Sequence, residues 1–174
     1  MNLNDDATSM QSPRIEKVVI NMSVGKSGEP LQKAMSVLEL LTGQKPCQRI
    51  AKQTIREWGI RKNEPIACVA TLRGEKAFEF LRKSLDARGN RLSRSSFDLN
   101  GNFSFGIKEH IEIRGVRYDP SIGIFGMDVC VSLGKPGYRV KRRRINNARV
   151  GKKQQLTPDE AAKYVAETFG IEVI

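Results

Sequence analysis

Apolar and polar residues alternate along several short stretches of the chain, and this alternation predicts strands. Residues 15–22 (IEKVVINM) place every second residue from Val18 to Met22 on one apolar side, while Lys17 and Asn21 lie on the other side. Such alternation is typical of a strand with one buried face and one more polar face. We therefore expect a strand here, with Lys17 and Asn21 directed away from the core.

A second alternating stretch, residues 66–74 (IACVATLRG), puts Leu72 on the apolar side and Thr71 and Arg73 on the opposite side. The adjacent pair Asn100-Gly101 predicts a hairpin turn. Further strands are expected at residues 107–113 (IKEHIEI), 126–133 (GMDVCVSL) and 171–174 (IEVI).

Apolar residues at helical spacing predict three amphipathic helices, at residues 31–42, 75–85 and 158–169. Gly43 directly follows the first of these helices and is suited to ending it. The last helix is preceded by Thr157 and has Glu160 in its first turn, which is the arrangement of a capping box. Gly170 is then expected to end that helix.

The predicted strands cluster in pairs rather than alternating strictly with helices. This order favours an α+β fold: a largely antiparallel sheet with helices packed on one face, plus a long basic loop and a basic C-terminal stretch that ends in a helix. We expect residues 1–12 to form a flexible N-terminal tail. Residues 13–174 would form a single domain that includes the basic segment 134–153 and the C-terminal helix.

Positive charge changes this picture, because it is concentrated in two places. The chain of 174 residues has 30 Lys and Arg against 19 Asp and Glu, a net charge of +11. Residues 134–153 carry +9 with no acid, and residues 45–63 carry +5, so the remainder of the chain is −3. Two such clusters favour a polyanionic partner over the alternative of a solvated basic face.

Other classes of protein find little support in the sequence. No apolar run is long enough for a membrane span, and the polar, acidic N-terminus resembles neither a signal nor a transit peptide. Three widely spaced cysteines, with no CxxC, favour reduced thiols in the cytosol over disulfides or zinc. The scattered carboxylates show no metal-binding spacing, so we expect no metal and no cofactor.

Catalytic residues are not expected either. Gly25-Lys26-Ser27 resembles the end of a phosphate-binding loop, but the glycine that should stand five residues earlier is Ile20. The only histidine, His110, is expected to be a surface or sheet residue on the strand 107–113. A phosphate-binding enzyme built on Lys26 is nevertheless the alternative from another class, and a sequence-tolerant RNA chaperone driven by the basic segment is a third possibility.

Several blocks in fixed order identify a family resemblance. PRIEKVVINMSVGK, LTGQKP, GIRKNEPIACVATLRGEKAFEFL and FDLNGNFSFGIKEHI resemble the universal large-subunit ribosomal protein five, the family that attaches 5S rRNA to the central protuberance. YDPSIGIFGMDVCVSL and the RVKRRR-containing stretch resemble its archaeal and eukaryotic branch, whose eukaryotic member is called protein eleven. The resemblance runs from about Pro13 to the C-terminus and favours the archaeal form.

The resemblance implies a non-enzymatic constituent of the large ribosomal subunit in the cytoplasm. In the family, an Asn, a Gln, a Thr and an Arg face 5S rRNA, and the matching positions here are Asn21, Gln44, Thr71 and Arg73. Amide, hydroxyl and guanidinium groups are suitable donors to RNA phosphates, 2′-hydroxyls and base edges.

The family also has a long loop that touches P-site tRNA, and the matching stretch here is 49–63. Its candidate residues are Arg49, Lys52, Arg56, Trp58, Arg61 and Lys62. Trp58 could stack on an unpaired base or anchor the loop to the domain, and the sequence favours neither.

Further contacts are implied for the rest of the chain. We expect the basic segment to bind rRNA, including 23S rRNA, and the chain to contact neighbouring proteins of the central protuberance. The family also bridges to small-subunit protein thirteen, a contact expected near residues 115–121. The rRNA-binding residues of the basic segment would be Lys141, Arg142, Arg143, Arg144, Arg149, Lys152 and Lys153.

Overall fold

A five-stranded antiparallel sheet forms the centre of the computed structural model, which describes residues 11–116 and 119–174. The expected N-terminal tail therefore falls almost entirely outside the described residues, and the division into a tail and one domain stays a prediction. The strand order is β2-β3-β1-β6-β5. The strands are β1 Arg14–Ser23, β2 Cys47–Ile50, β3 Pro65–Leu72, β5 Phe103–Ile107 and β6 Met127–Gly134.

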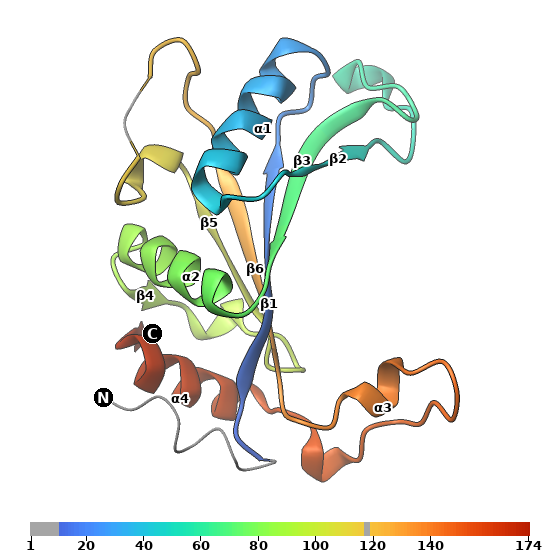
Figure 1. Ribbon diagram of the computed structural model, residues 1–174, viewed down its shortest axis with the longest axis vertical. Helices are drawn as coiled ribbons and strands as arrows, with labels where there is room; N and C mark the ends of the chain where they lie inside the picture. The colour runs from blue at the N-terminus through green and yellow to red at the C-terminus, as the bar shows by residue number, and fades with distance from the viewer. Residues whose placement is uncertain (1–10, 117–118) are drawn as a thin grey trace.

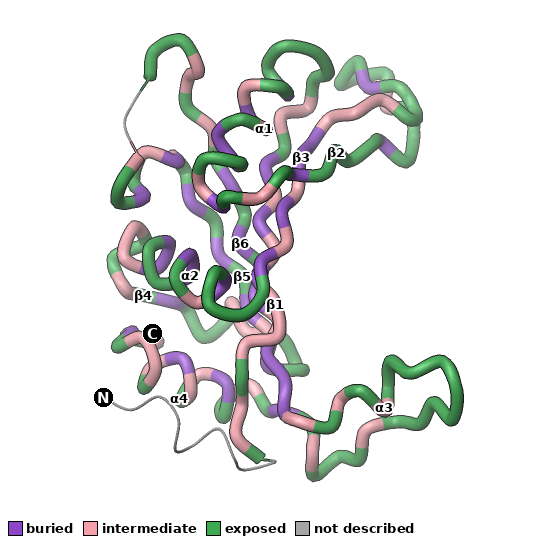
Figure 2. The backbone as a smooth tube through the Cα atoms, in the orientation of Figure 1, coloured by how far each residue is buried: buried purple, intermediate pink, exposed green. Residues whose placement is uncertain are grey.

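Helices α1 (Glu29–Thr42) and α2 (Glu75–Ala87) both lie on one side of this sheet (Figure 1), as the sequence predicts for an α+β fold. Helix α1 ends where expected, because Gly43 takes the left-handed conformation (φ 60°) and donates its N–H to the Glu39 carbonyl. The buried residues follow the sheet and the inner sides of these helices (Figure 2).

The core is built on the alternation in β1. Val18, Ile20 and Met22 are at most 1% exposed, and their cross-strand partners Leu72 and Val129 are buried as well. Cross-strand partners point to the same side of a sheet, so one side of β1 is fully enclosed by its neighbours and the helices. In the part of the chain that the structure describes, no helix or strand covers the face of the sheet that lies away from α1 and α2 (Figure 1).

The C-terminal part of the chain packs beside this core. Helix α4 (Pro158–Phe169) begins with the predicted capping box, in which the Thr157 hydroxyl accepts from the N–H of Glu160, and it ends at Gly170 in the left-handed conformation. The predicted last strand is confirmed as β7 (Glu172–Val173), which pairs in parallel with β4 (Arg91–Leu92). The short helix α3 (Arg139–Arg142) lies within the basic segment.

The predicted strand 107–113 is wrong. The strand β5 begins at Phe103 and ends at Ile107, where the predicted strand should begin, and residues 110–112 form a 3-10 turn. His110 is buried, its N–H donates to the Phe125 carbonyl at 2.9 Å, and its Nδ1 accepts from the Phe125 N–H at 3.2 Å. These two bonds turn the chain inward after Ile107, so His110 is neither a surface nor a strand residue.

Asn100-Gly101 does form the predicted turn. The Asp98 carboxylate accepts from the backbone N–H groups of Asn100 and Asn102, and Phe97 and Phe103 form a single bridge across the turn. Gly101 has φ 74°, and a Cβ there would lie 2.8 Å from the Leu156 side chain. The turn is thereby held close against the C-terminal part of the chain.

Protonation of His110 should destabilise the protein. Burial lowers the pKa of His110 below its ordinary value of 6.5, and the charge of Glu109 opposes this only in part. The folded state then binds a proton less readily than the unfolded state, so the associated stability is present above pH 6.5 and is lost as the pH falls below it. Chemical denaturation of the wild type and of His110→Gln measures the free energy of unfolding at each pH. Between pH 7 and about pH 5.5, this free energy should fall more steeply in the wild type than in the variant. The same dependence of the free energy of unfolding on pH in both proteins would contradict the claim that the buried His110 resists protonation.

Candidate nucleic-acid interface

The uncovered face of the sheet carries small and polar side chains in cross-strand rows. Val19 of β1 pairs with Thr71 on β3 and with Cys130 on β6, which in turn pairs with Ser104 on β5. We call this surface the open face. The parallel row one step along runs through Cys47, Val69, Asn21, Asp128 and Gly106.

Three of the four residues expected to face 5S rRNA lie on or beside the open face. Asn21 is half-buried and its Nδ2 donates to the Ser23 hydroxyl at 3.2 Å, which leaves its carbonyl oxygen available. Thr71 is half-buried in the neighbouring strand. Arg73 is exposed and stands one residue beyond the end of β3, so the expectation that it lies within the strand is wrong by one position.

Gln44 lies in the connection from α1 to β2. Its backbone N–H lies 3.3 Å from the Thr42 hydroxyl, and its carbonyl is 3.2 Å from the same oxygen. The Thr42 hydroxyl also donates to the Leu38 carbonyl, so this corner is fixed by the end of the helix. Gln44 is half-buried and is not part of the cross-strand rows of the open face.

The loop between β2 and β3 is an ordered extension of these two strands. Its base is closed by hydrogen bonds between Ala51 and residues 63–64, and Ile55 and Ile60 exchange two further backbone bonds. Gly59 closes the 3-10 turn Arg56–Trp58 in the left-handed conformation. This loop extends away from the body of the molecule (Figure 1).

The cationic residues expected in this loop are exposed, but they do not all lie together. Arg49 is in β2 and pairs with Ala67, on the side of the open face, so it groups with Asn21 and Thr71 rather than with the loop. Trp58 is 71% exposed, which argues against the alternative that it anchors the loop to the domain. The exposed cations of the loop proper are Lys52, Arg56, Arg61 and Lys62.

The Gly25-Lys26-Ser27 stretch is not arranged to bind a phosphate. The backbone N–H groups of Val24 and Gly25 both donate to the Ile66 carbonyl at 3.0 Å. The Ser27 hydroxyl donates to the Glu64 carboxylate at 2.7 Å. Two backbone donors and the Ser27 hydroxyl of this stretch are therefore already used, and a carboxylate, which would repel a phosphate, stands beside them.

The basic segment is tied to the fold by two of its own cations. Lys135 is only 6% exposed, and its Nζ donates to the Glu160 carboxylate at 2.7 Å; this hydrogen bond lowers the pKa of Glu160. Arg142 pairs with Glu16 of β1. The segment lacks acids of its own, but acids elsewhere in the fold neutralise these two charges.

The remaining cations of the segment are exposed, and in the described part of the chain none of them forms an ion pair. Arg143 donates through Nε to the Asn146 carbonyl, which still leaves its charge without an acidic partner. These exposed cations are Arg139, Lys141, Arg143, Arg144, Arg149, Lys152 and Lys153.

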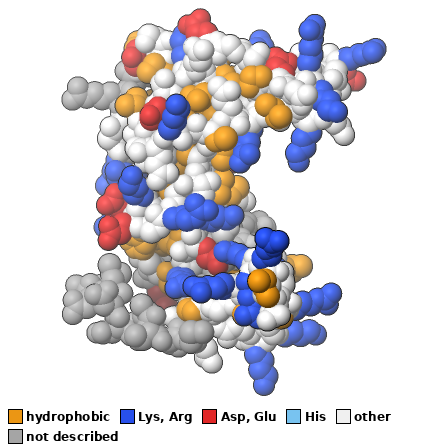
Figure 3. Space-filling model, turned by 45° about the vertical axis from the view of Figure 1, so that its right-hand side comes forward, with side chains coloured by type: hydrophobic (Ala, Val, Ile, Leu, Met, Phe, Trp, Pro, Cys, Tyr) orange, Lys and Arg blue, Asp and Glu red, His pale blue; other side chains and the backbone are white. Residues whose placement is uncertain are grey.

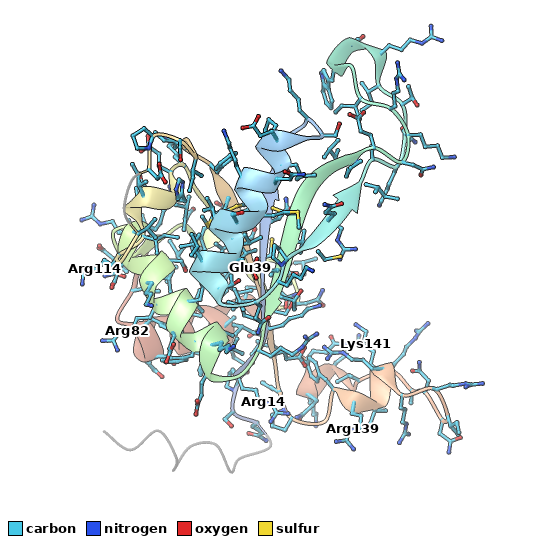
Figure 4. All side chains as sticks on the ribbon, turned by 45° about the horizontal axis from the view of Figure 1, so that its top comes forward. Arg14, Glu39, Arg82, Arg114, Arg139 and Lys141 are labelled. Atoms are coloured by element: carbon cyan, nitrogen blue, oxygen red, sulfur yellow. The ribbon has the colours of Figure 1, made fainter. Side chains whose placement is uncertain are left out.

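A groove of about 780 Å³ separates the basic segment from the nearby end of the sheet. Lys17 and Ser132, which pair across β1 and β6, line one side, and Lys141 and Arg149 line the other. Arg139 and Lys141 project from different sides of α3 (Figure 4), and only Lys141 lines the groove. The alternation in β1 predicts that Lys17 is exposed, but nothing in the sequence places it opposite the basic segment.

The two basic regions stand at the two ends of one hollow. Figure 3 shows a C-shaped molecule with Lys and Arg on both projecting ends and along the inner edge. By their places in Figure 1, these ends are the β2–β3 loop and the basic segment, and the open face lies between them. Such an arrangement concentrates positive potential on one side, where a polyanion would be attracted.

The described side chains of this surface are suited to binding a ligand and not to catalysing a reaction. Partial desolvation of the thiol and the charge of the neighbouring Asp128 raise the pKa of Cys130, so this thiol, although accessible to solvent, is not an activated nucleophile. Within residues 11–116 and 119–174, no group of three His, Cys, Asp or Glu side chains could hold a metal ion. No helix in those ranges is long and apolar enough to cross a membrane.

The fold and this surface define an α+β protein with a cationic, concave binding face. The family model for ribosomal protein L5 matches residues 8–61, and the model for the C-terminus of the same ribosomal family matches residues 65–172. The chain is 51% identical to the large ribosomal subunit protein uL5 of Pyrobaculum aerophilum over 94% of this chain and 92% of that protein. It is 52% identical to the uL5 protein of Aeropyrum pernix over 93% of this chain and 85% of that protein. It is 47% identical to the uL5 protein of Nitrosopumilus maritimus over 94% of this chain and 95% of that protein.

The chain belongs to the ribosomal protein L5 family. It is therefore a structural, non-enzymatic constituent of the large subunit of the cytoplasmic ribosome, as the sequence resemblance implies. The relatives named here are archaeal, in agreement with the expected branch.

Glu160→Gln should loosen the attachment of the basic segment. Glutamine can still complete the capping box of α4, but it removes the charge that faces the buried Lys135. Because Glu160 is half exposed, we expect the free energy of unfolding to fall by about 1 kcal/mol at neutral pH. The pKa of Glu160 is lowered from 4.5, so this stability is present above pH 4.5 and is lost as the pH falls below it.

Denaturation curves at neutral and acidic pH test this expectation. Thr157→Ala is the matched control, because it removes the cap and leaves the Lys135–Glu160 pair in place, so its effect should not change with pH. A Glu160→Gln effect of the same size at both pH values would show that the ion pair does not contribute.

Proposed function

We propose that this chain binds 5S rRNA with the open face and helps attach that RNA in the central protuberance of the large subunit. The observation that carries the proposal is the uncovered sheet face between two cationic ends. Asn21, Thr71 and Arg73 offer donors and acceptors on or beside that face, and Arg49 and Lys17 add charge. Gln44 would contribute from the corner between α1 and β2.

The geometry of the open face suits RNA in particular. An A-form helix presents phosphates and 2′-hydroxyls along a wide, shallow minor groove, and short polar side chains on a sheet can meet these groups. Arginine supplies several fixed donors for phosphate oxygens. Asp128, in register with Asn21, is an acid on this face and would have to meet a donor of the RNA, such as a 2′-hydroxyl or an exocyclic amine.

The β2–β3 loop is proposed to contact P-site tRNA. Lys52, Arg56, Arg61 and Lys62 can meet phosphates, and the exposed Trp58 ring is available to stack on an unpaired base. The loop extends away from the body of the molecule, so it could reach a partner that arrives and leaves (Figure 1).

The basic segment is proposed to bind rRNA, including 23S rRNA, through its exposed cations. Neighbouring proteins of the central protuberance and small-subunit protein thirteen complete the proposed partners. The expected bridge at 115–121 includes residues 117–118, which lie outside the described residues, so this contact rests on the family resemblance. A sequence-tolerant RNA chaperone is the competing function, and it predicts equal binding of 5S rRNA and tRNA in competition gel shifts at several salt concentrations.

Arg73→Ala should weaken binding of archaeal 5S rRNA by about 1.5–3 kcal/mol, the worth of a charge-assisted hydrogen bond. The side chain is exposed and makes no ion pair in the described part of the chain, so the fold should be unaffected. Arg82→Ala is the matched control: Arg82 is exposed on α2, on the helix-covered side (Figure 4), and its loss changes the net charge equally.

Titration by gel shift, with thermal melts of both variants, measures this difference. Equal affinities of the Arg73→Ala and Arg82→Ala variants would remove Arg73 from the interface.

Removing the loop tip, residues 52–61, should separate the two proposed surfaces. The base of the loop at Ala51 and residues 63–64 remains, so β2 and β3 should still pair. We expect 5S rRNA binding and incorporation into the subunit to stay largely intact, while tRNA dissociates faster from the P site of assembled ribosomes. Trp58→Ala, a milder change at an exposed position, should act in the same direction.

The two measurements are a 5S rRNA gel shift and the dissociation rate of P-site tRNA, made on the same variant. Loss of 5S binding with normal tRNA dissociation would reverse the assignment of the two surfaces.

A further inference from the structure

The groove between the basic segment and the sheet has the size and lining of a small-ligand site. Its volume of about 780 Å³ falls within the range of about 300–1,000 Å³ that is usual for such sites. Its walls come from the end of the sheet, from the turn at 98–102 and from the basic segment. An A-form duplex keeps its bases stacked inside, so a space of this size suits an extruded nucleotide better than a duplex.

Among the described residues that line the groove, the charged side chains are predominantly cationic. Lys17, Lys141, Arg149 and Lys152 have no acidic partner, whereas Arg142 is paired with Glu16, the one carboxylate of this lining. These cations come from β1 and from the basic segment, so they face the groove from more than one direction. The charge is suited to a phosphate that enters between them.

Apolar and amide groups lie among these charges. Leu133 and Leu156 are buried beneath the groove. Asn102 is fixed, because its Oδ1 accepts from the Leu133 N–H and its Nδ2 donates to Asp98. The side-chain amide of Asn100 makes no hydrogen bond within the described residues and is free to meet a base edge.

Tyr138 supplies a fixed aromatic ring. Its hydroxyl donates to the Gln154 carbonyl at 3.2 Å and accepts from the Leu156 N–H at 2.8 Å, while the half-buried side chain lines the groove. A ring held at its polar end loses little freedom when a base stacks on it. Aromatic side chains beside cations are the common means of holding unpaired bases.

We propose that this groove holds one unpaired nucleotide of ribosomal RNA, with its base on Tyr138, its phosphate between Lys17 and Arg149, and a base edge at Asn100. The inference rests on the proposed rRNA-binding function, and it adds the chemical form of the RNA and the residues that select it. The basic segment then recognises strand structure as well as charge.

Two variants isolate the ring of Tyr138. Tyr138→Phe and Tyr138→Leu both lose the hydrogen bonds to Gln154 and Leu156, but only phenylalanine keeps an aromatic face. Affinity for a short oligouridylate at low salt should fall by less than about threefold in Tyr138→Phe, because the aromatic face remains although its polar end is released. It should fall by about fivefold or more in Tyr138→Leu, as the loss of one base–aromatic stack predicts.

The opposite wall has its own matched pair. Asn100→Ala should weaken oligouridylate binding, whereas Leu99→Ala should not, because Leu99 is 92% exposed in the same turn and does not line the groove. An RNA duplex of mixed sequence should show no difference between the two Tyr138 variants. Free uridine monophosphate offers the groove one base and one phosphate. It lacks the neighbouring phosphates of a strand, which the other exposed cations of the basic segment would meet, so it should compete only weakly.

Several results would overturn the inference. Equal losses in Tyr138→Phe and Tyr138→Leu would make the tyrosine a purely structural residue, and no loss in either would remove it from the interface. Competition by uridine monophosphate as strong as that by the oligonucleotide would make the groove a site for free nucleotides. None of these results depends on 5S rRNA, so the proposed function is tested separately by the Arg73 and Arg82 variants.

Discussion

The difference between the two faces of the central strand β1 determines how the rest of the molecule is arranged. β1 pairs with a strand on each side, and both α1 and α2 lie on the same face of the sheet. Val18, Ile20 and Met22 are therefore fully enclosed, and burial of such side chains stabilises the fold by about 1.5–3 kcal/mol each. The residues between them face the uncovered side, where Asn21 is held at a fixed position by a strand that cannot shift by one residue without exposing the core.

The same arrangement determines which cations of the basic segment have acidic partners. A cation buried in the fold needs an acidic partner, and Lys135 has one in Glu160. Arg142, at the edge of the groove, is neutralised by Glu16. The other cations of the basic segment have no such partner among the described residues and stay in solvent, where mutual repulsion makes a polyanion favourable. The fold thus divides its cations into those that hold the basic segment in place and those left available to RNA.

Much of this architecture could be predicted from the sequence, because it depends on local periodicity. The alternation in β1 and β3 identified the buried and open faces, and Thr157 and Glu160 identified the start of α4. The strand predicted at 107–113 was wrong because the tertiary bonds between His110 and Phe125 override a weak β pattern.

The groove could not be predicted at all. Its walls are distant in the sequence, and nothing in the residues around Asn100 indicates that they face Tyr138. In the same way, the sequence assigns Lys135 and Arg142 to the basic segment without indicating their acidic partners. The periodicity of the sequence indicates which side of a helix or strand faces the core. It does not indicate which of the exposed sides lie opposite each other in the folded protein.

Whether RNA lies against the open face decides how this molecule works, and Cys130 allows the contact to be measured directly. Cys130 is exposed in the row between Val19 and Ser104, whereas Cys68 is fully buried and should not react in either state. Alkylation of the protein alone and in complex with 5S rRNA, quantified by mass spectrometry, should show strong protection of Cys130 in the complex. Alkylation of Cys130 at the same rate in a saturated complex would show that the RNA binds elsewhere and would contradict the account.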